Sequence, residues 1–218
     1  MTVKVKVCGI TNREDAAAAL ECGADALGFN FYRQSPRYID PADACGIIRR
    51  LPPLAAAVGV FVNVPDPADI AAIALASGVR ILQLHGDETP AYCRELAGWA
   101  VIKALRIGSG PLPTNLDEYP VRAFLLDAKD DVLFGGTGKV LDWPLAKTVS
   151  RVRPVILAGG LSVSNVGQAI RLVRPYAVDV CSGVESSPGK KDATRLKAFM
   201  DEVRNVATEI ERPTGAAG

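Results

Sequence analysis

Residues 3–11 read Val-Lys-Val-Lys-Val-Cys-Gly-Ile-Thr, and this stretch decides the fold. Its valines occupy every second position, as on one face of a β-strand, so Lys6 and Cys8 share the other face. The following residues predict a helix that Asn12 caps and that ends at Gly23. A thiol at the carboxyl end of a strand, just before a helix, lies where α/β proteins place their chemistry. The alternative is a small buried apolar cysteine, and the stretch alone does not decide between the two.

Strand-like and helix-like segments alternate through the rest of the chain. Further strands are expected at 24–31, 55–63, 80–84, 100–107, 122–128, 154–158 and 177–181. Helices are expected at 41–51, 67–77, after Thr89, near Leu116 (a short one at most), at 143–150, 164–173 and 192–209. Continuously apolar strands indicate a parallel sheet buried on both faces. The count of eight predicts one α/β domain, a (β/α)8 barrel over residues 1–211, with 212–218 as a flexible tail. An open doubly wound sheet is the alternative.

Composition limits the kind of partner. The 218 residues carry 25 Lys and Arg against 24 Asp and Glu, so no strong field attracts nucleic acid or a membrane surface. No apolar run reaches the ~18 residues of a membrane span. Five cysteines without a Cys-x-x-Cys pair indicate reduced thiols in a cytoplasmic protein. A single histidine, His85, excludes a histidine-rich metal site.

In a barrel, the residues at the strand ends meet at one mouth. We expect Cys8, Asn63, His85 and Asp127 there, together with two glycine turns after the seventh and eighth strands. These turns contain Gly159-Gly160 and Ser182-Gly183, and their backbone N–H groups predict a phosphate site. The alternative is that paired glycines only make tight turns.

The glycine-rich segment Gly135-Gly136-Thr137-Gly138-Lys139 does not match a nucleotide-binding loop. Its glycines are wrongly spaced for a P-loop, and Val140 stands where Ser or Thr is needed. We expect Gly135, Gly136 and Gly138 to form a flexible loop over a substrate. The chain has no dinucleotide fingerprint either, so no cofactor is expected.

Two side chains are suited to acid and base chemistry. Asp127 follows an apolar run, where desolvation favours the protonated form that a general acid needs. Cys8 must be a thiolate to act as a base, and the charge of Lys6, ~7 Å away along the strand, favours that form. Lys6 could instead point into solvent. Lys103 and Asp179, also within strands, are expected in the same buried polar cluster.

Several short motifs, taken in order, resemble one enzyme family. They are Lys6-Val-Cys-Gly-Ile-Thr11, Gly23-Ala-Asp-Ala-Leu-Gly-Phe29, Ser35-Pro-Arg37, Gly59-Val-Phe-Val-Asn63, Gln83-Leu-His-Gly86, Leu126-Asp127, Gly135-Gly-Thr-Gly138 and Val178-Asp-Val-Cys-Ser-Gly-Val-Glu185. The chain resembles phosphoribosylanthranilate isomerase from about Val3 to Lys191. The departures are Cys181, where the family more often has serine, and the proline-rich segment after the fifth strand.

The resemblance implies a (β/α)8 barrel and a cofactor-independent Amadori rearrangement in tryptophan biosynthesis. Its substrate would be N-(5-phosphoribosyl)anthranilate and its product a carboxyphenylamino-deoxyribulose phosphate. The matched positions imply Cys8 as general base, Asp127 as general acid and Arg37 as the residue that holds the anthranilate carboxylate. Lys6, His85 and Asp179 are expected to take part in substrate binding. We expect a monomer or homodimer acting on a small phosphorylated molecule.

Two other functions are considered. The related sugar isomerase of histidine biosynthesis resembles a two-aspartate design with two-fold internal similarity, which is not found in this sequence. A catalytically silent phosphosugar-binding barrel would not need both Cys8 and Asp127. Substrate turnover would separate the enzyme from the binding protein, because anthranilate compounds fluoresce.

Overall fold

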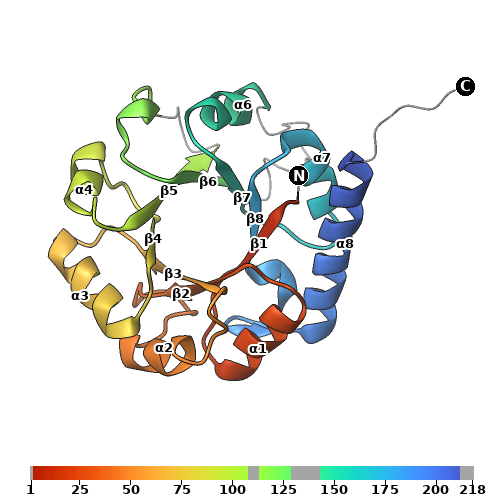
Figure 1. Ribbon diagram of the computed structural model, residues 1–218, viewed down its shortest axis with the longest axis horizontal. Coiled ribbons are helices and arrows are strands. Elements are labelled where there is room, and N and C mark those ends of the chain that lie inside the picture. The colour runs from red at the N-terminus through yellow and green to blue at the C-terminus, as the bar shows by residue number, and fades with distance from the viewer. Residues whose placement is uncertain (1, 108–112, 129–142, 212–218) are drawn as a thin grey trace, which may run out of the picture.

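Eight parallel strands close into a barrel in the order of the sequence, with the helices around the ring (Figure 1). This computed structural model describes residues 2–107, 113–128 and 143–211. The strands are β1 (Lys4–Val7), β2 (Ala26–Asn30), β3 (Ala56–Phe61), β4 (Ile81–Leu84), β5 (Ala100–Ile107), β6 (Ala123–Ala128), β7 (Val155–Ala158) and β8 (Ala177–Val180). Pairing of β1 with β8 closes the ring. The predicted (β/α)8 barrel is confirmed, and the open sheet is excluded.

Seven helices are described. They are α1 (Arg13–Glu21), α2 (Pro41–Ile48), α3 (Pro67–Ser77), α4 (Pro90–Glu95), α6 (Trp143–Val152), α7 (Val166–Val173) and α8 (Ala193–Glu211). Of these, α1 to α4 each start after a residue whose side chain caps the helix. Asp40 and Asp66 accept hydrogen bonds from backbone N–H groups of α2 and α3, and each is followed by a proline at the first helical position. α3 ends at Gly78, whose φ of 86° is the left-handed conformation that suits glycine.

Alternate residues of each strand face opposite sides of the barrel wall. On β5, Val101 and Leu105 belong to the large apolar core, whereas Ile102 and Ala104 belong to a second, smaller cluster. The first core fills the layer between the strands and the helices, and the second fills the barrel interior. Lys103 shares the outer face with Val101 and Leu105, so it points away from the interior.

Two connections differ from a plain strand–helix alternation. Between β5 and β6, residues 113–122 contain only a 3₁₀ turn, η1 (Leu116–Glu118), which agrees with the expected short helix near Leu116. After β8 comes a second 3₁₀ turn, η2 (Ser182–Val184), and then an antiparallel hairpin of β9 (Glu185–Ser187) and β10 (Lys190–Lys191). The sequence did not predict this hairpin.

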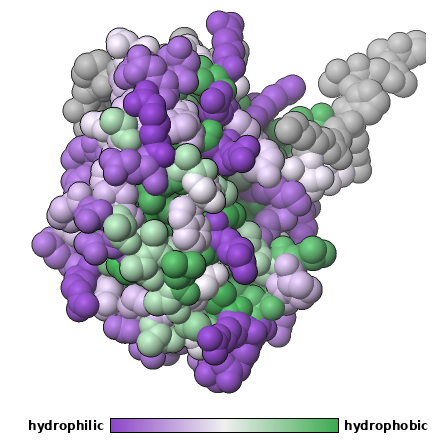
Figure 2. Space-filling model, turned by 60° about the vertical axis from the view of Figure 1, so that its left-hand side comes forward, coloured by the Kyte–Doolittle hydropathy of each residue, from purple (hydrophilic) through white to green (hydrophobic). Residues whose placement is uncertain are grey.

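The outer surface is mixed in polarity. On the face shown in Figure 2, polar residues border and interrupt the apolar ones. The most exposed large apolar side chains are Leu54 at 96% and Leu75 at 74%. Single exposed leucines are ordinary on a folded protein, and they indicate no particular partner. In the described ranges, none of the helices has the length and apolar character needed to cross a bilayer.

Candidate active site

A cavity of about 300 Å³ lies at the end of the barrel where the strands finish. Eight of the residues expected in the site line it, namely Cys8, Arg37, His85, Asp127, Gly159, Gly160, Asp179 and Ser182. They come from β1, β4, β6, β7, β8 and the loop between β2 and α2. Six of the residues expected at the strand ends thus line one cavity, namely Cys8, His85, Asp127, Gly159, Gly160 and Ser182, whereas Arg37 reaches it from a loop and Asp179 from within β8.

The Cys8 thiol lies among groups that favour its ionised form. The pKa of Cys8 is well below its ordinary value, first because Cys181 donates a hydrogen bond to it. The ammonium groups of Lys6 and Lys191 lower it further, whereas burial opposes them. The corresponding pKa of Cys181 is raised by this hydrogen bond, by burial and by the charge of Cys8. Of the two thiols, Cys8 is therefore the one whose ionised form the surroundings favour.

Lys6 lies behind Cys8 rather than in solvent. It is 3% exposed and does not line the cavity. Its Nζ lies 3.0 Å from both carboxylate oxygens of Asp179, the residue paired with it across β1 and β8. A Cβ at Gly28 would lie 2.8 Å from Cys8 Sγ and 3.0 Å from Lys6 Nζ, so glycine is needed there for both side chains. This position suits support of the Cys8 charge better than direct contact with a substrate.

Asp179 combines burial with an ion pair. Burial raises its pKa to about 7, although the charge of Lys6 acts in the opposite direction. The pKa of Lys6 is itself raised, because Asp179 and Cys8 outweigh the effect of its burial. The barrel interior beneath the cavity thus holds a charged pair in contact with the thiolate.

Asp127 takes part in a chain of hydrogen bonds across the cavity. His85 Nε2 lies 2.9 Å from Asp127 Oδ2, and Gln83 Nε2 lies 2.9 Å from His85 Nδ1. Because the Gln83 amide nitrogen can only donate, Nδ1 accepts and Nε2 carries the ring proton toward Asp127. Asp127 is 33% exposed, so the burial expected for it is wrong: the apolar residues Phe124 and Leu126 lie on the outer face of β6.

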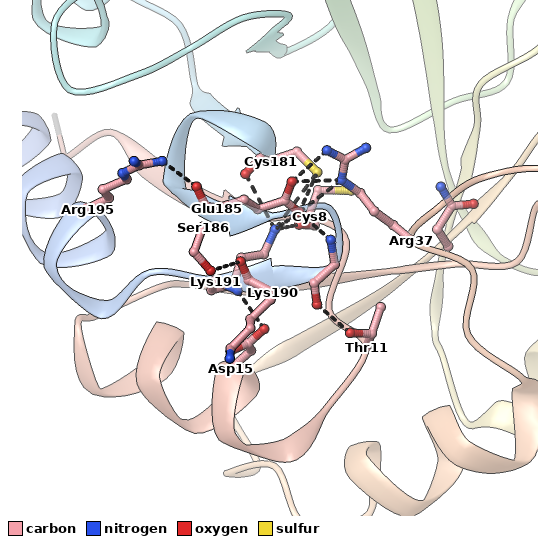
Figure 3. Close-up of polar contacts among 12 residues, drawn as sticks. Cys8, Thr11, Asp15, Arg37, Cys181, Glu185, Ser186, Lys190, Lys191 and Arg195 are labelled. Carbon is pink, nitrogen blue, oxygen red and sulfur yellow. Dashed lines mark hydrogen bonds and ion pairs between the residues drawn. The ribbon is translucent and has the colours of Figure 1, made fainter.

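Arg37 is held in place by a buried carboxylate (Figure 3). Its Nε lies 2.9 Å and its Nη2 2.6 Å from oxygens of Glu185, which also pairs with Lys191 at 2.9 Å. Burial alone would raise the pKa of Glu185, but hydrogen bonds from Arg37 and Lys191 hold it at about 2. Two cations share one anion, so one positive charge is left over beside Cys8. Nη1 of Arg37 makes no hydrogen bond to another described residue. The Nη1–Nη2 edge of the guanidinium is therefore available for a carboxylate.

The two glycine turns lie beside each other at the cavity wall. Gly159 and Gly160 have φ of 88° and 59°, the left-handed conformation that glycine adopts readily. Asn165 fixes this turn by donating to the Gly160 carbonyl at 2.8 Å and accepting from the Ser162 N–H at 2.7 Å. These hydrogen bonds hold the turn in place, and Gly159 and Gly160 face the cavity.

Three expectations are corrected. Gly183 does not line the cavity; a Cβ there would lie 2.0 Å from the Leu161 carbonyl, so it permits close packing of the two turns. Asn63 has φ of 48° and bonds to the loop after β4 instead of facing the cavity. Lys103 pairs with buried Glu88 at 3.0 Å, on the outer face of β5, so it is not in the Asp179 cluster. The expected loop of Gly135, Gly136 and Gly138 lies outside the described residues.

Three comparisons with known proteins agree on the family. The sequence model of the N-(5'-phosphoribosyl)anthranilate isomerase family matches residues 5–202 of this chain. The enzyme of that name from Trichlorobacter lovleyi is 49% identical over 199 residues, which is 91% of this chain and 96% of the relative.

The chain belongs to the phosphoribosylanthranilate isomerase family.

Two solved structures of family members cover 94% and 93% of this chain. One, in complex with reduced 1-(o-carboxyphenylamino)-1-deoxyribulose 5-phosphate, is 41% identical with a TM-score of 0.80 and is covered completely. The other, described as monomers of the dimeric isomerase from Thermotoga maritima, is 40% identical with a TM-score of 0.79 and is 99% covered. The expectation of an isomerase of tryptophan biosynthesis is confirmed, and the histidine-pathway enzyme is not supported.

Three residues of this isomerase site were missed from the sequence. They are Gln83, Glu185 and Lys191. Glu185 ended one of the motifs that resemble the family, and Pro188-Gly189 next to it is a turn signal that could have indicated a change of chain direction there. Gln83 could have been found from strand alternation, because it lies on β4 two residues before His85 and so its side chain faces the same side. In the described ranges, no group of three or more His, Cys, Asp or Glu side chains is arranged to hold a metal ion.

Proposed function

We propose that this chain converts N-(5'-phosphoribosyl)anthranilate to 1-(o-carboxyphenylamino)-1-deoxyribulose 5-phosphate, with Cys8 as general base and Asp127 as general acid. The observation that carries the proposal is that a stabilised thiolate and a carboxyl group line the same 300 Å³ cavity. A rearrangement of this kind needs one group that gives a proton and one that removes a proton. Two groups with different surroundings supply both.

Asp127 acts first in this proposal. It donates a proton to the furanose ring oxygen while the bond from that oxygen to C1′ breaks, and the anthranilate nitrogen supplies the electrons that form a Schiff base. The 33% exposure of Asp127 and its position on the cavity wall support contact with the sugar. His85, 2.9 Å from Asp127, is close enough to exchange a proton with it.

Cys8 then removes the proton from C2′. The electrons of that C–H bond form the C1′–C2′ double bond while those of the C1′–N double bond return to nitrogen, which gives an enolamine that tautomerises to the ketone. Lys6 and Lys191 support this step by keeping the sulfur ionised before the substrate arrives. The hydrogen bond between Cys181 and Cys8 adds to this effect, because it also lowers the pKa of Cys8.

Charge complementarity supports the orientation of the substrate. The free edge of Arg37 suits the anthranilate carboxylate, because a guanidinium can bind a carboxylate through two parallel hydrogen bonds. The backbone of Gly159, Gly160 and Ser182 suits the phosphate. Asp179 lines the same cavity and remains a proposed binding residue.

We also propose that the protein is cytoplasmic, acts without nucleic acid and is a monomer or a homodimer. Support comes from five free thiols and a net charge of +1. The dimeric relative from Thermotoga maritima makes the homodimer a specific alternative. Sedimentation equilibrium at several protein concentrations would decide between one and two copies.

The test of the catalytic roles is a pair of near-isosteric variants. In Cys8→Ser the hydroxyl is far harder to ionise, and in Asp127→Asn the amide has no acidic proton. We expect kcat to fall by about 10²–10⁴-fold in each, with a much smaller change in KM. Turnover is followed by the loss of anthranilate fluorescence. Cys93→Ser, which changes a buried thiol on α4, is the control and should keep its activity. A Cys8→Ser protein within a few-fold of the wild type would exclude Cys8 as the base.

A further inference from the structure

Cys8 and Cys181 occupy facing positions on the two strands that close the barrel. Val7 pairs with Val180, and the Cys8 N–H donates to the Val180 carbonyl at 2.8 Å, so Cys8 and Cys181 are the next residues on each side. Neighbouring strands lie ~4.8 Å apart, and a disulfide needs Cα atoms ~4.4–6.8 Å apart. Both side chains line the same cavity, so they point in the same direction. The backbone geometry therefore permits a bond between the two sulfurs.

The two thiols are also in contact in a cationic environment. They share a hydrogen bond, and Figure 3 shows the sulfur atoms side by side. Lys191 Nζ lies 3.9 Å from Cys181 Sγ, and the Lys6 ammonium lies behind Cys8. Cations next to a thiolate increase the fraction of the nucleophilic form. The other three cysteines are on the outer layer: Cys22 at the end of α1, Cys45 in α2 and Cys93 in α4.

We propose that Cys8 and Cys181 form an oxidative modification site at which a peroxide converts the two thiols into a disulfide. This goes beyond the isomerase function, because the bond can form whether or not Cys8 is the catalytic base. The Cys8 thiolate attacks one oxygen of the peroxide and the O–O bond breaks, which gives a sulfenic acid and, with hydrogen peroxide, hydroxide. The Cys181 sulfur then displaces the sulfenic oxygen, and its thiol proton leaves with that oxygen as water. Two electrons pass from the two sulfurs to the peroxide.

Cys181 determines the fate of the oxidised site. A neighbouring thiol traps a sulfenic acid as a disulfide, which a dithiol reductant reverses, whereas an isolated sulfenic acid can be oxidised irreversibly to the sulfinic acid. Serine at this position could not form the bond, so the modification site depends on Cys181.

The test uses hydrogen peroxide on the full chain, followed by mass spectrometry of a non-reducing digest. We expect a species that joins the peptide of Cys8 to that of Cys181 with the loss of two hydrogens. Isomerase activity should fall by about 10²-fold or more as this species accumulates, because the disulfide occupies the base. Dithiothreitol should restore both the free thiols and the activity.

Two variants make the result specific. In Cys181→Ser, and in Cys181→Ala as a second variant of different polarity, the same dose should leave sulfinic acid on Cys8 and activity that dithiothreitol does not restore, relative to each untreated variant. Cys45→Ser, which removes a thiol on α2, should behave as the wild type. Absence of the joined peptide in the oxidised wild type would overturn the proposal, as would equal recovery of the Cys181 variants. A disulfide with undiminished turnover would uphold the site and instead exclude Cys8 as the base.

Discussion

Gln83 shows how a single amide controls the group next to the proposed acid. Its Nε2 donates to His85 Nδ1, while its buried Oε1 has no hydrogen-bond partner among the described residues. An orphaned buried acceptor costs ~1–3 kcal/mol. Turning the amide over would place Nε2 at this buried position instead, so one polar group of Gln83 lacks a partner among the described residues in either orientation.

This arrangement predicts the tautomer of His85. We expect an unprotonated Nδ1 and a protonated Nε2 in the wild type, because Nδ1 accepts from Gln83 and Nε2 donates to Asp127. In Gln83→Glu the carboxylate can only accept, so Nδ1 should become protonated. Since His85 is the only histidine, its ¹⁵N shifts can be read from the whole chain without assignment. Gln83→Met, of similar length but without donor or acceptor, is the control. Identical Nδ1 shifts in the wild type and in Gln83→Glu would contradict the prediction.

The residues of the site were predicted unequally from the sequence. Cys8, His85 and Asp127 were found because strand alternation and strand ends are local signals. The exposure of Asp127 was predicted wrongly, because an apolar run along β6 faces the helices and not the cavity. The partner of Arg37 could not be found in this way, because Glu185 is 148 residues away and their contact depends on barrel closure.

At the scale of elements, the strands were predicted closely and the β9–β10 hairpin was not. Strands of three and two residues are too short for alternation to show. What holds this hairpin is a set of long-range contacts: Glu185 with Arg37, Lys191 with the Cys8 carbonyl, and Thr11 with the Gly189 carbonyl. Local sequence signals do not contain such contacts.

The hairpin predicts a dependence of stability on pH. The pKa of Glu185 is about 2 in the folded chain and 4.5 for an ordinary glutamate. A lowered pKa means that its stabilisation is complete above about pH 4.5 and is lost as the pH falls toward 2. The difference corresponds to about 3 kcal/mol at neutral pH. Glu185→Gln should therefore lower the free energy of unfolding at pH 7 by this order, and by much less near pH 2.

Urea unfolding at pH 7 and at low pH measures this effect. Glu95→Gln, at an exposed position on α4, is the control and should change the free energy of unfolding by less than about 0.5 kcal/mol. A Glu185→Gln effect that is the same at both pH values would show that the charge of Glu185 is not what stabilises the hairpin.

The turn after β7 predicts a binding effect. At Gly160 φ is 59°, which a β-branched residue adopts only with strain. Gly160→Val should displace the turn and raise KM for the phosphorylated substrate by about tenfold or more, with a smaller change in kcat, because one phosphate hydrogen bond to a charged group contributes ~1.5–3 kcal/mol. Gly98→Val is the control, since a Cβ at Gly98 meets no atom within 4 Å. An unchanged KM in Gly160→Val would remove this turn from the proposed phosphate site.

At the scale of the whole molecule, the barrel closes where β1 meets β8, and a buried ion pair spans that seam. Lys6 and Asp179 are 3% and 8% exposed and are paired in register, so each charge has little access to water. The Lys6–Asp179 ion pair therefore joins the two strands that close the barrel, and its ammonium group also favours the ionised form of Cys8.

The closing pair predicts a strongly non-additive effect on stability. Asp179→Leu leaves the Lys6 ammonium buried without its partner, which typically costs ~3–5 kcal/mol. The double variant Lys6→Met with Asp179→Leu replaces both charges by apolar groups and should recover most of that loss. Urea unfolding of the wild type, both single variants and the double variant measures the coupling free energy. Lys4→Met is the matched control on the same strand: the Lys4–Asp25 pair is as short, at 2.8 Å, but 49% and 37% exposed, so its loss should cost less than about 1 kcal/mol. If the single and double variants at the seam were additive, the buried pair would not be a coupled unit, and closure would depend on the apolar contacts of the two strands alone.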